Sequence, residues 1–497
     1  MIDGQQRLTT LLLILRAFYD KFANMKDPES ERTRDMIEKC IWATNTFGIA
    51  DKDVLKINSE VATDNDKEQF LKLLKTGLVP EGTSSQYVVN YRFFQQKIAE
   101  FLDEFPSYFA YLPARILGNC ILLPIEAESQ DTALRIFSTL NDRGLPLSDA
   151  EIFKAQFYKY YGDRGEKDTF IEDWKNLEEV SGQVFKPSKG TPMDELFTRY
   201  MYYLRAKARN KNTTVEAVRK FFERDKYAHL KNDEAMRDLK YLVDFWQSVA
   251  AQDAEVFSAS TLRKLYALNY AHNSMWEYTT SVYFLQNRDE DGALEESDFN
   301  DFLDKITAFI FAYGITNPGV NALRTPAFEE MINIIDDKPV LFSRFKFDEQ
   351  GTRSMFENYV FKNQRPITRS FITWYALTFD EQGPLSLGDN FQIEHIFPKK
   401  RQEMESSLKQ ESNLDSLGNK VLLEASINSR ASDYRFEDKK KIYSGEMRRG
   451  RNRQPSKIAE IQELIERDRF EESDIMDREK LMFDSFFGFL REQELLK

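Results

Sequence analysis

The chain has 497 residues, a formal net charge of −13 and an apolar fraction of 41%. This length is typical of two to four domains, and the acidic balance argues against a general nucleic-acid coat protein. The cysteines, Cys40 and Cys120, are isolated, so they predict neither a disulfide framework nor a structural zinc site. The most apolar run, LTTLLLIL, is far shorter than the roughly 20 residues that span a bilayer. We therefore expect a cytoplasmic protein without a membrane segment.

The first residues predict a loop followed by a helix with one apolar side. The sequence DGQQRLTT (3–10) stands at the start of this helix, with Asp3 or Gly4 near its first turn. The side chains of Gln5, Gln6 and Arg7, with the free N–H groups of a helix start, are able to hold an anion. The simpler alternative is a polar helix cap with Arg7 at the surface.

A second polar turn is predicted near residue 144. The run NCILLPIEAES is typical of a strand, and DTALRIFSTLND is typical of a helix that ends before Gly144. Ser148, with Glu151 three residues later, predicts a capping box for the next helix. Arg143 in this turn is placed to pair with Asp149 or to reach a phosphate. The alternative is a helix–turn–helix joint without a ligand. From 163 to 345 helical periodicity continues without a recognisable chemical motif.

Three C-terminal segments together predict a strand–loop–strand–helix unit. They are IEHIFP (393–398), LGNKVLLEASINSR (417–430) and YRFEDKKKIYSG (434–445). The second contains a turn at Gly418 and Asn419, a strand over Lys420–Glu424 and a helix start between Ser426 and Asn428. His395 is one of three histidines, and the others, in helical segments without companion ligands, are expected to be structural.

This order of motifs resembles the His-Me finger, or HNH, nucleases, in which an acid–histidine pair, an asparagine and a helix residue form the site. The closer resemblance is to the C-terminal domain of GmrSD-type restriction enzymes, with an EHI.P … LGN … N arrangement. The resemblance implies that His395 is the general base and that Asn419 braces the loop orienting it. It also implies that Glu394 and Asn428 bind a metal ion.

These residue types suit phosphodiester hydrolysis. An imidazole has an ordinary pKa of about 6.5 and is therefore able to take a proton from water near neutral pH. Carboxylate and amide oxygens are hard ligands that suit Mg²⁺, or another divalent cation, better than zinc. Residues 395–457 contain fifteen Lys and Arg against nine Asp and Glu, a surplus of six positive charges. We therefore expect Arg430, Lys439 and Lys440 to contact DNA phosphates. The alternative is a buried strand beside a solvated basic helix.

DGQQR also resembles a motif of the GmrSD N-terminal domain, a ParB/sulfiredoxin-like fold linked to nucleotide hydrolysis. By this resemblance Asp3, Gln5, Gln6 and Arg7 bind a nucleoside triphosphate. The family motif lies well inside its domain, so the first domain here is expected to be incomplete. The stretch IFSTLNDRGLPLSDAEIFK (136–154) resembles a third family segment, which makes Arg143 and Lys154 candidate phosphate contacts.

We therefore predict a mainly α protein with an N-terminal α/β remnant, a helical middle and a C-terminal ββα-metal nuclease embedded in helices. The predicted boundaries are 1–162, 163–345 and 346–497. The expected function is modification-dependent (type IV) cleavage of modified phage DNA, regulated by a nucleotide. The alternative is a non-cleaving DNA- or nucleotide-binding regulatory protein. The motifs select no particular DNA modification or nucleotide, and they leave the oligomeric state open.

Overall fold

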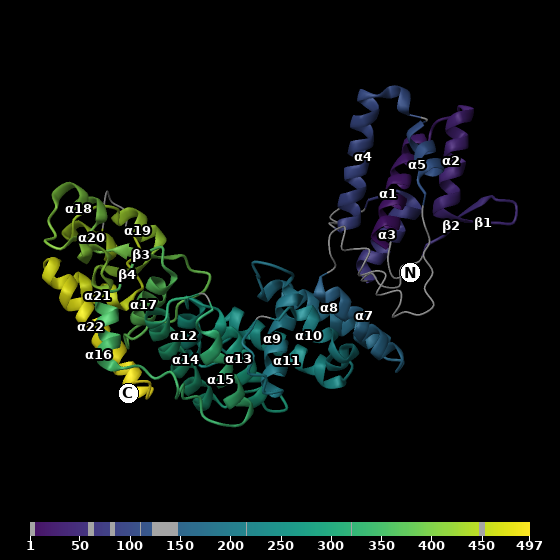
Figure 1. Cartoon of the computed structure of the whole chain (residues 1–497). Coiled ribbons are helices and arrows are strands. Elements are labelled where there is room, and N and C mark those ends of the chain that lie inside the picture. The colour runs from purple at the N-terminus through teal and green to yellow at the C-terminus, as the bar shows by residue number, and fades with distance from the viewer. Residues whose placement is uncertain are drawn as a thin grey trace. The chain divides into compact units, whose positions relative to one another are not determined.

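The computed structural model describes residues 5–57, 64–79, 85–109, 111–121, 148–214, 216–319, 321–446 and 453–497. The chain divides into two compact units, residues 1–147 and 148–497. Helices dominate both units, and the strands form small two-stranded sheets (Figure 1). This agrees with the predicted mainly α class. None of the helices in these ranges combines the length and apolar character needed to cross a membrane.

The first unit is a helical cluster with one antiparallel hairpin. Its elements are α1 (Gln5–Phe22), α2 (Pro28–Ile41), β1 (Trp42–Thr44), β2 (Ala50–Leu55), α3 (Asp64–Thr76), α4 (Gln86–Glu104), η1 (Pro106–Tyr108) and α5 (Tyr111–Asn119). Leu13, Phe18 and Phe22 of α1 are buried in a core that α1 shares with α2 and α4. Most of the strand predicted over 119–129 lies outside the described residues.

The second unit begins with a long array of helices. These are α7 (Asp149–Gly162), α8 (Lys167–Val184), α9 (Pro192–Lys207), α10 (Val218–Glu223), η2 (Arg224–Leu230), α11 (Asp233–Ala251), α12 (Ala259–Asn269), α13 (Met275–Asn287), α14 (Glu296–Thr316), α15 (Arg324–Ile335), α16 (Glu349–Glu357) and α17 (Pro366–Ala376). The capping box predicted at Ser148 and Glu151 is confirmed at the start of α7. Phe153 and Phe157 bury α7 against Phe197, so this helix packs in the second unit.

The predicted nuclease motif lies at the other end of this unit. Its elements are β3 (Phe391–His395), α18 (Lys399–Glu405), η3 (Glu411–Asp415), η4 (Leu417–Asn419), β4 (Lys420–Glu424), α19 (Ala425–Ala431), α20 (Phe436–Tyr443), α21 (Ala459–Ile465) and α22 (Glu472–Glu492). The strand expected over Lys420–Glu424 is present with those bounds. The helix expected after it begins at Ala425.

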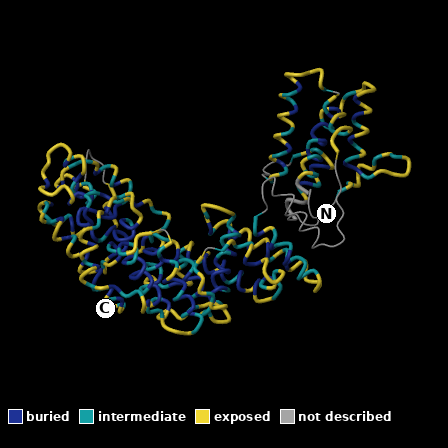
Figure 2. Tube along the Cα trace, viewed as in Figure 1, coloured by how far each residue is buried: buried dark blue, intermediate teal, exposed yellow. Residues whose placement is uncertain are grey.

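One hydrophobic core runs through the second unit, from Ala150 to Leu495. Figure 2 shows its buried positions in dark blue along the inside of the helical array. The rings of Phe309 and Phe342 stack with centroids 3.6 Å apart, and Phe347 packs on Phe309 at 5.5 Å. Packing is therefore continuous across residue 345, and the domain boundary expected there stays a prediction.

Candidate active site

The candidate site is built on the antiparallel pair of β3 and β4. The register places Phe391 opposite Glu424 and His395 opposite Lys420. Residues 421–423 of β4 are fully buried apolar side chains, which anchors the pair against α17. Consecutive side chains of a strand point to opposite faces of the sheet. Glu394 and His395 therefore project to different sides, although they are neighbours in the sequence.

Glu394 lies in a buried charge cluster on its side of the sheet. Its Oε1 accepts a hydrogen bond from Lys439 Nζ at 2.5 Å and another from the Tyr443 hydroxyl at 2.9 Å. Lys439 also donates to the backbone carbonyl of His395 at 2.6 Å. Burial raises the pKa of Glu394 and lowers the pKa of Lys439. The predicted role of Glu394 as a metal ligand beside the imidazole does not fit this arrangement.

His395 lies in a second polar cluster with three residues. Lys420 Nζ is 2.7 Å from His395 Nε2 and 2.7 Å from Asn363 Oδ1, to which it donates. Asp415 Oδ1 lies 3.3 Å from Lys420 Nζ and 3.9 Å from His395 Nε2. No described residue forms a hydrogen bond to Nδ1 of His395, and the side chain is 20% exposed. Nδ1 is therefore the ring nitrogen available to a ligand.

The two basic groups of this pair have strongly shifted pKa values. Burial, together with the positive charge of Lys420, lowers the pKa of His395 to about 4. Burial also lowers the pKa of Lys420 to about 8, although Asp415 opposes that shift. The imidazole is consequently neutral near pH 7. Because a charged ammonium is only a donor, Nε2 must accept the hydrogen bond from Lys420 in that state.

Asn419 connects the two strands beyond the histidine. Its Oδ1 accepts from the N–H of Phe397 at 2.7 Å, and its Nδ2 donates to the carbonyls of Phe397 and Leu414 at 3.1 Å each. Its own carbonyl accepts from the N–H of Ile396 at 2.9 Å. These bonds hold the turn that follows His395, the place where the resemblance puts a bracing residue.

The same turn requires glycine at position 418. A Cβ at this position would overlap the backbone carbonyl of Ile475 in α22. Arg478, also on α22, donates to the carbonyl of Gly418 at 2.7 Å and is paired with the buried Glu460. Close backbone packing therefore fixes the turn against the last long helix.

Asn428 forms no described contact with the imidazole cluster. Its Nδ2 donates to Gln392 Oε1 at 2.7 Å, and Gln392 shares a face of β3 with Glu394. The predicted set of Glu394, Asn428 and His395 therefore does not fit one cation. Within the described ranges, no group of three His, Cys, Asp or Glu side chains is arranged to hold a metal ion. We derive no catalytic step through a metal from this geometry.

The predicted DNA contacts differ in their exposure. Lys439 is fully buried in its ion pair with Glu394, because α20 turns this residue toward the core, and its contact with DNA stays a prediction. Lys440 donates to the carbonyl of Arg467 at 2.5 Å and is half-buried. Arg430 donates through Nε to the carbonyl of Ser426 at 3.2 Å and lines a surface pocket.

The N-terminal candidates are only partly described. Asp3 and Arg143 lie outside the described residues, and Gln5 and Gln6 are placed in α1 by their backbone alone. Arg7, the third residue of α1, is exposed. The nucleotide site therefore stays a prediction. Lys154 forms an ion pair with Glu178 at 3.2 Å. Asp149, the predicted partner of Arg143, pairs with Arg219 at 2.9 Å.

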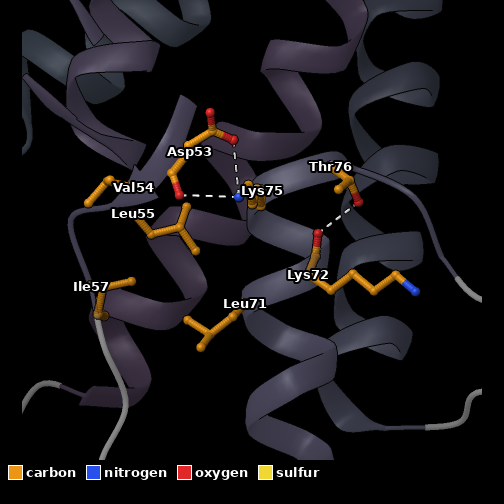
Figure 3. Close-up of a pocket in the computed structure, with 8 residues that line it drawn as sticks. All are labelled: Asp53, Val54, Leu55, Ile57, Leu71, Lys72, Lys75 and Thr76. Carbon is orange, nitrogen blue, oxygen red and sulfur yellow. Dashed lines mark hydrogen bonds and ion pairs between the residues drawn. The ribbon is translucent and has the colours of Figure 1, made fainter. Parts of the chain in front are cut away.

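The first unit has a surface pocket of about 460 Å³ between β2 and α3. Figure 3 shows that Lys75 turns toward Asp53, with which it forms an ion pair at 3.3 Å, whereas the ammonium of Lys72 points away. The hydroxyl of Thr76 donates to the carbonyl of Lys72 at 2.8 Å. None of the predicted nucleotide-binding residues lines this pocket.

Two comparisons with protein families agree with the motifs at each end. Residues 1–158 match the GmrSD restriction endonuclease N-terminal domain, and residues 347–485 match the C-terminal domain of the same endonucleases. The chain belongs to the GmrSD family. No curated protein matches it. The C-terminal GmrSD match contains both strands, the imidazole cluster and the Asn419 turn.

Three residues of the GmrSD imidazole cluster escaped prediction. Lys420 follows the LGN motif directly, but a lysine inside an apolar strand gave no chemical signal from its spacing. Asp415 lies in a 3₁₀ turn, and Asn363 comes from a loop before α17. A lysine at the start of the run KVLLE, next to three apolar residues, was the one available sign, because buried lysines require a partner.

Proposed function

We propose that the chain is a DNA endonuclease in which His395 takes a proton from the attacking water through Nδ1. The observation that supports this most is the close pair of His395 and Lys420, held beside the Asn419 turn within the matched endonuclease domain. DNA is the substrate class expected from the restriction endonuclease domains that match both ends of the chain.

The protonation state of the pair controls this chemistry. While Lys420 is charged, it donates to Nε2 and the neutral ring carries its proton on Nδ1, where no lone pair is available. When the pair has lost one proton, Nε2–H donates to the neutral Lys420 amine, and Nδ1 is free to accept a proton. Water then loses its proton to Nδ1, its oxygen bonds to phosphorus, and the leaving oxygen takes a proton from solvent.

The surrounding residues position this pair. Asn363 and Asp415 accept from Lys420 and keep its nitrogen against the ring. Asn419 fixes the backbone just after His395, and this restrains the position from which the imidazole projects. Precise placement of a base contributes to rate because it removes the entropic cost of orienting it.

We propose that cleavage depends on a DNA modification, uses a divalent cation such as Mg²⁺ and is regulated by a nucleotide bound near DGQQR. Defence against phage in the cytoplasm is the corresponding role. The cation would need ligands other than Glu394 in its present ion pair. Its requirement is tested by comparing Mg²⁺ with a chelator.

One observation favours the alternative of a non-cleaving DNA-binding regulator. Glu394, the acid of the acid–histidine motif, is locked by Lys439 and Tyr443 on the side of the sheet opposite His395. To hold a catalytic metal ion, as predicted, this carboxylate would need access to the substrate. If this ion pair persists when DNA binds, the motif is a structural remnant and the chain binds DNA without cutting it.

The deciding experiment incubates the purified chain with unmodified and glucosylated hydroxymethylcytosine DNA, with Mg²⁺ or with chelator. The matched variants are His395→Ala and His229→Gln, since His229 stacks on Phe221 in the helical array and has no part in the proposed site. Cleavage lost in His395→Ala and kept in His229→Gln supports the proposal. Equal cleavage by both variants, or none by the wild type on either DNA, contradicts it.

A further inference from the structure

A basic pocket lies at the other end of the β3–β4 pair from His395. Its volume is about 740 Å³. One wall is α19, with Ser426 and Arg430, and the other is the segment after α20, with Arg453, Gln454 and Lys457. Glu424, the last residue of β4, lies at its base. The pocket is part of the matched endonuclease domain but contains no residue of the imidazole cluster.

Four charged residues line the pocket: Glu424, Arg430, Arg453 and Lys457. The carboxylate of Glu424 accepts from the Ser456 hydroxyl at 2.8 Å and from the N–H of Lys457 at 2.7 Å. The ammonium of Lys457 is paired with Asp389. Among the described residues, neither Arg430 nor Arg453 forms an ion pair with a carboxylate.

The two guanidinium groups act on each other. Partial burial and the positive charge of Arg453 lower the pKa of Arg430. Two like charges that line one pocket repel unless an anion lies between them. Arginine presents a planar set of donors that matches the oxygens of a phosphate, and the Ser426 hydroxyl and Gln454 amide add neutral donors. The pocket therefore has the chemistry of a phosphate site.

The position of the pocket relates it to the proposed cleavage site. Lys420 lies at the His395 end of β4, and Glu424 lies at the pocket end, four residue steps away. At about 3.4 Å per step this is roughly 14 Å. One DNA strand advances about 3.4 Å along the helix axis per nucleotide, so a strand that followed β4 would span this distance with roughly four nucleotides.

We propose that Arg430 and Arg453 bind a backbone phosphate of the DNA substrate, roughly four nucleotides from the bond that is cut. This inference rests on the proposed endonuclease function and adds a second contact that fixes where the strand lies. Such a contact contributes affinity and register but no base specificity. Gly445 helps to form the wall, because a Cβ there would overlap the carbonyl of Arg453.

The first test measures binding of a 30-base-pair duplex to the full chain in chelator, where cutting is not required. We expect Arg430→Gln and Arg453→Gln each to weaken binding about tenfold and to reduce the slope of log affinity against log salt by about one. Lys480→Gln, an exposed charge on α22, is the control for lost net charge. Equal effects of all three variants would overturn the proposal. Arg430→Lys is expected to keep the salt slope while losing part of the affinity.

The second test locates the phosphate. Neutral methylphosphonates are placed singly along the duplex, and binding is measured for the wild type and for Arg430→Gln. At the contacted position the neutral linkage should weaken the wild type about tenfold and leave Arg430→Gln almost unchanged, because the contact is already lost. Additive losses at every position would overturn the assignment.

A third arm distinguishes DNA from a free nucleotide. Calorimetry with ATP and with inorganic phosphate is run on the wild type and on Arg430→Gln. Uptake of ATP that depends on Arg430, with unchanged duplex binding, would show that the pocket takes a free phosphate ligand and would overturn the DNA assignment. Absence of cutting alone would contradict the proposed endonuclease but leave duplex binding, and hence this test, intact.

Discussion

Lys420 Nζ lies 2.7 Å from Nε2 of His395, and both groups are largely buried. The pair therefore shares its protons, and the protonation state of one nitrogen determines whether the other donates or accepts a hydrogen bond. This relationship, more than the acid–histidine sequence pair, defines what the candidate site can do chemically. It also leads directly to a prediction about pH.

The rate of cleavage should rise with pH through the pKa of Lys420, about 8, because Nδ1 becomes a base only after the pair loses a proton. For a single group of this pKa, the rate at pH 8.5 is roughly 25 times the rate at pH 6.5. In Lys420→Met the ring no longer accepts from an ammonium, so this ratio should fall to near one. Initial rates on plasmid DNA across pH 6 to 9 test both profiles. A wild-type rate that is flat over this range would reject the shared-proton mechanism.

The Glu394–Lys439 pair should contribute to stability as a unit. Glu394→Gln leaves a buried ammonium without its counter-charge, and such changes cost about 3–5 kcal/mol. The double variant Glu394→Gln/Lys439→Met removes both charges and should recover most of that loss. Urea unfolding of the three proteins measures the difference. If Glu394→Gln unfolds at the same urea concentration as the wild type, the buried pair described here does not form.

Gly418→Ala should destabilise the second unit by about 2–4 kcal/mol, because its methyl group would overlap the Ile475 carbonyl and push α22 away from the Asn419 turn. The control is Gly488→Ala in the same helix, where an added Cβ meets nothing within 4 Å. Alanine is the better helix former, so that variant should be up to about 1 kcal/mol more stable. Thermal unfolding followed by circular dichroism compares them. Equal melting temperatures would show that the turn does not pack as described.

His272 should make the protein acid-sensitive. Burial lowers the pKa of this imidazole to about 4, and its buried Nδ1 has no hydrogen-bond partner among the described residues. The unfolded chain binds its proton below pH 6.5 but the folded chain does so only near pH 4, so stability falls as pH drops through this window. The loss attributable to His272 is at most about 3 kcal/mol. His272→Phe should lose less stability than the wild type between pH 6.5 and 4, as measured by urea unfolding. Parallel losses would place the sensitivity elsewhere, for instance at His395.

Several elements could be predicted because they depend on local sequence. The capping box at Ser148 and Glu151, the strand Lys420–Glu424 and the basic helix after Tyr434 follow from hydrogen bonding and periodicity within a few residues. The motif spacings at both ends likewise indicated the GmrSD family, which the domain matches show. Local chemistry is sufficient for the cap because neighbouring residues supply its partners. The strand was visible as a short apolar run, although its pairing partner β3 is distant in sequence.

The composition of the site was decided by the tertiary structure alone. Adjacent residues of a strand face opposite ways, and which face meets which helix depends on packing that spacing does not record. α20 therefore brings Lys439 to Glu394, 45 residues away in sequence, while Asn363 and Asp415 meet Lys420 beside His395. The sequence specified the histidine and the turn that holds it. Folding selected the charges that set its pKa, because electrostatic effects depend on distance through space and on burial.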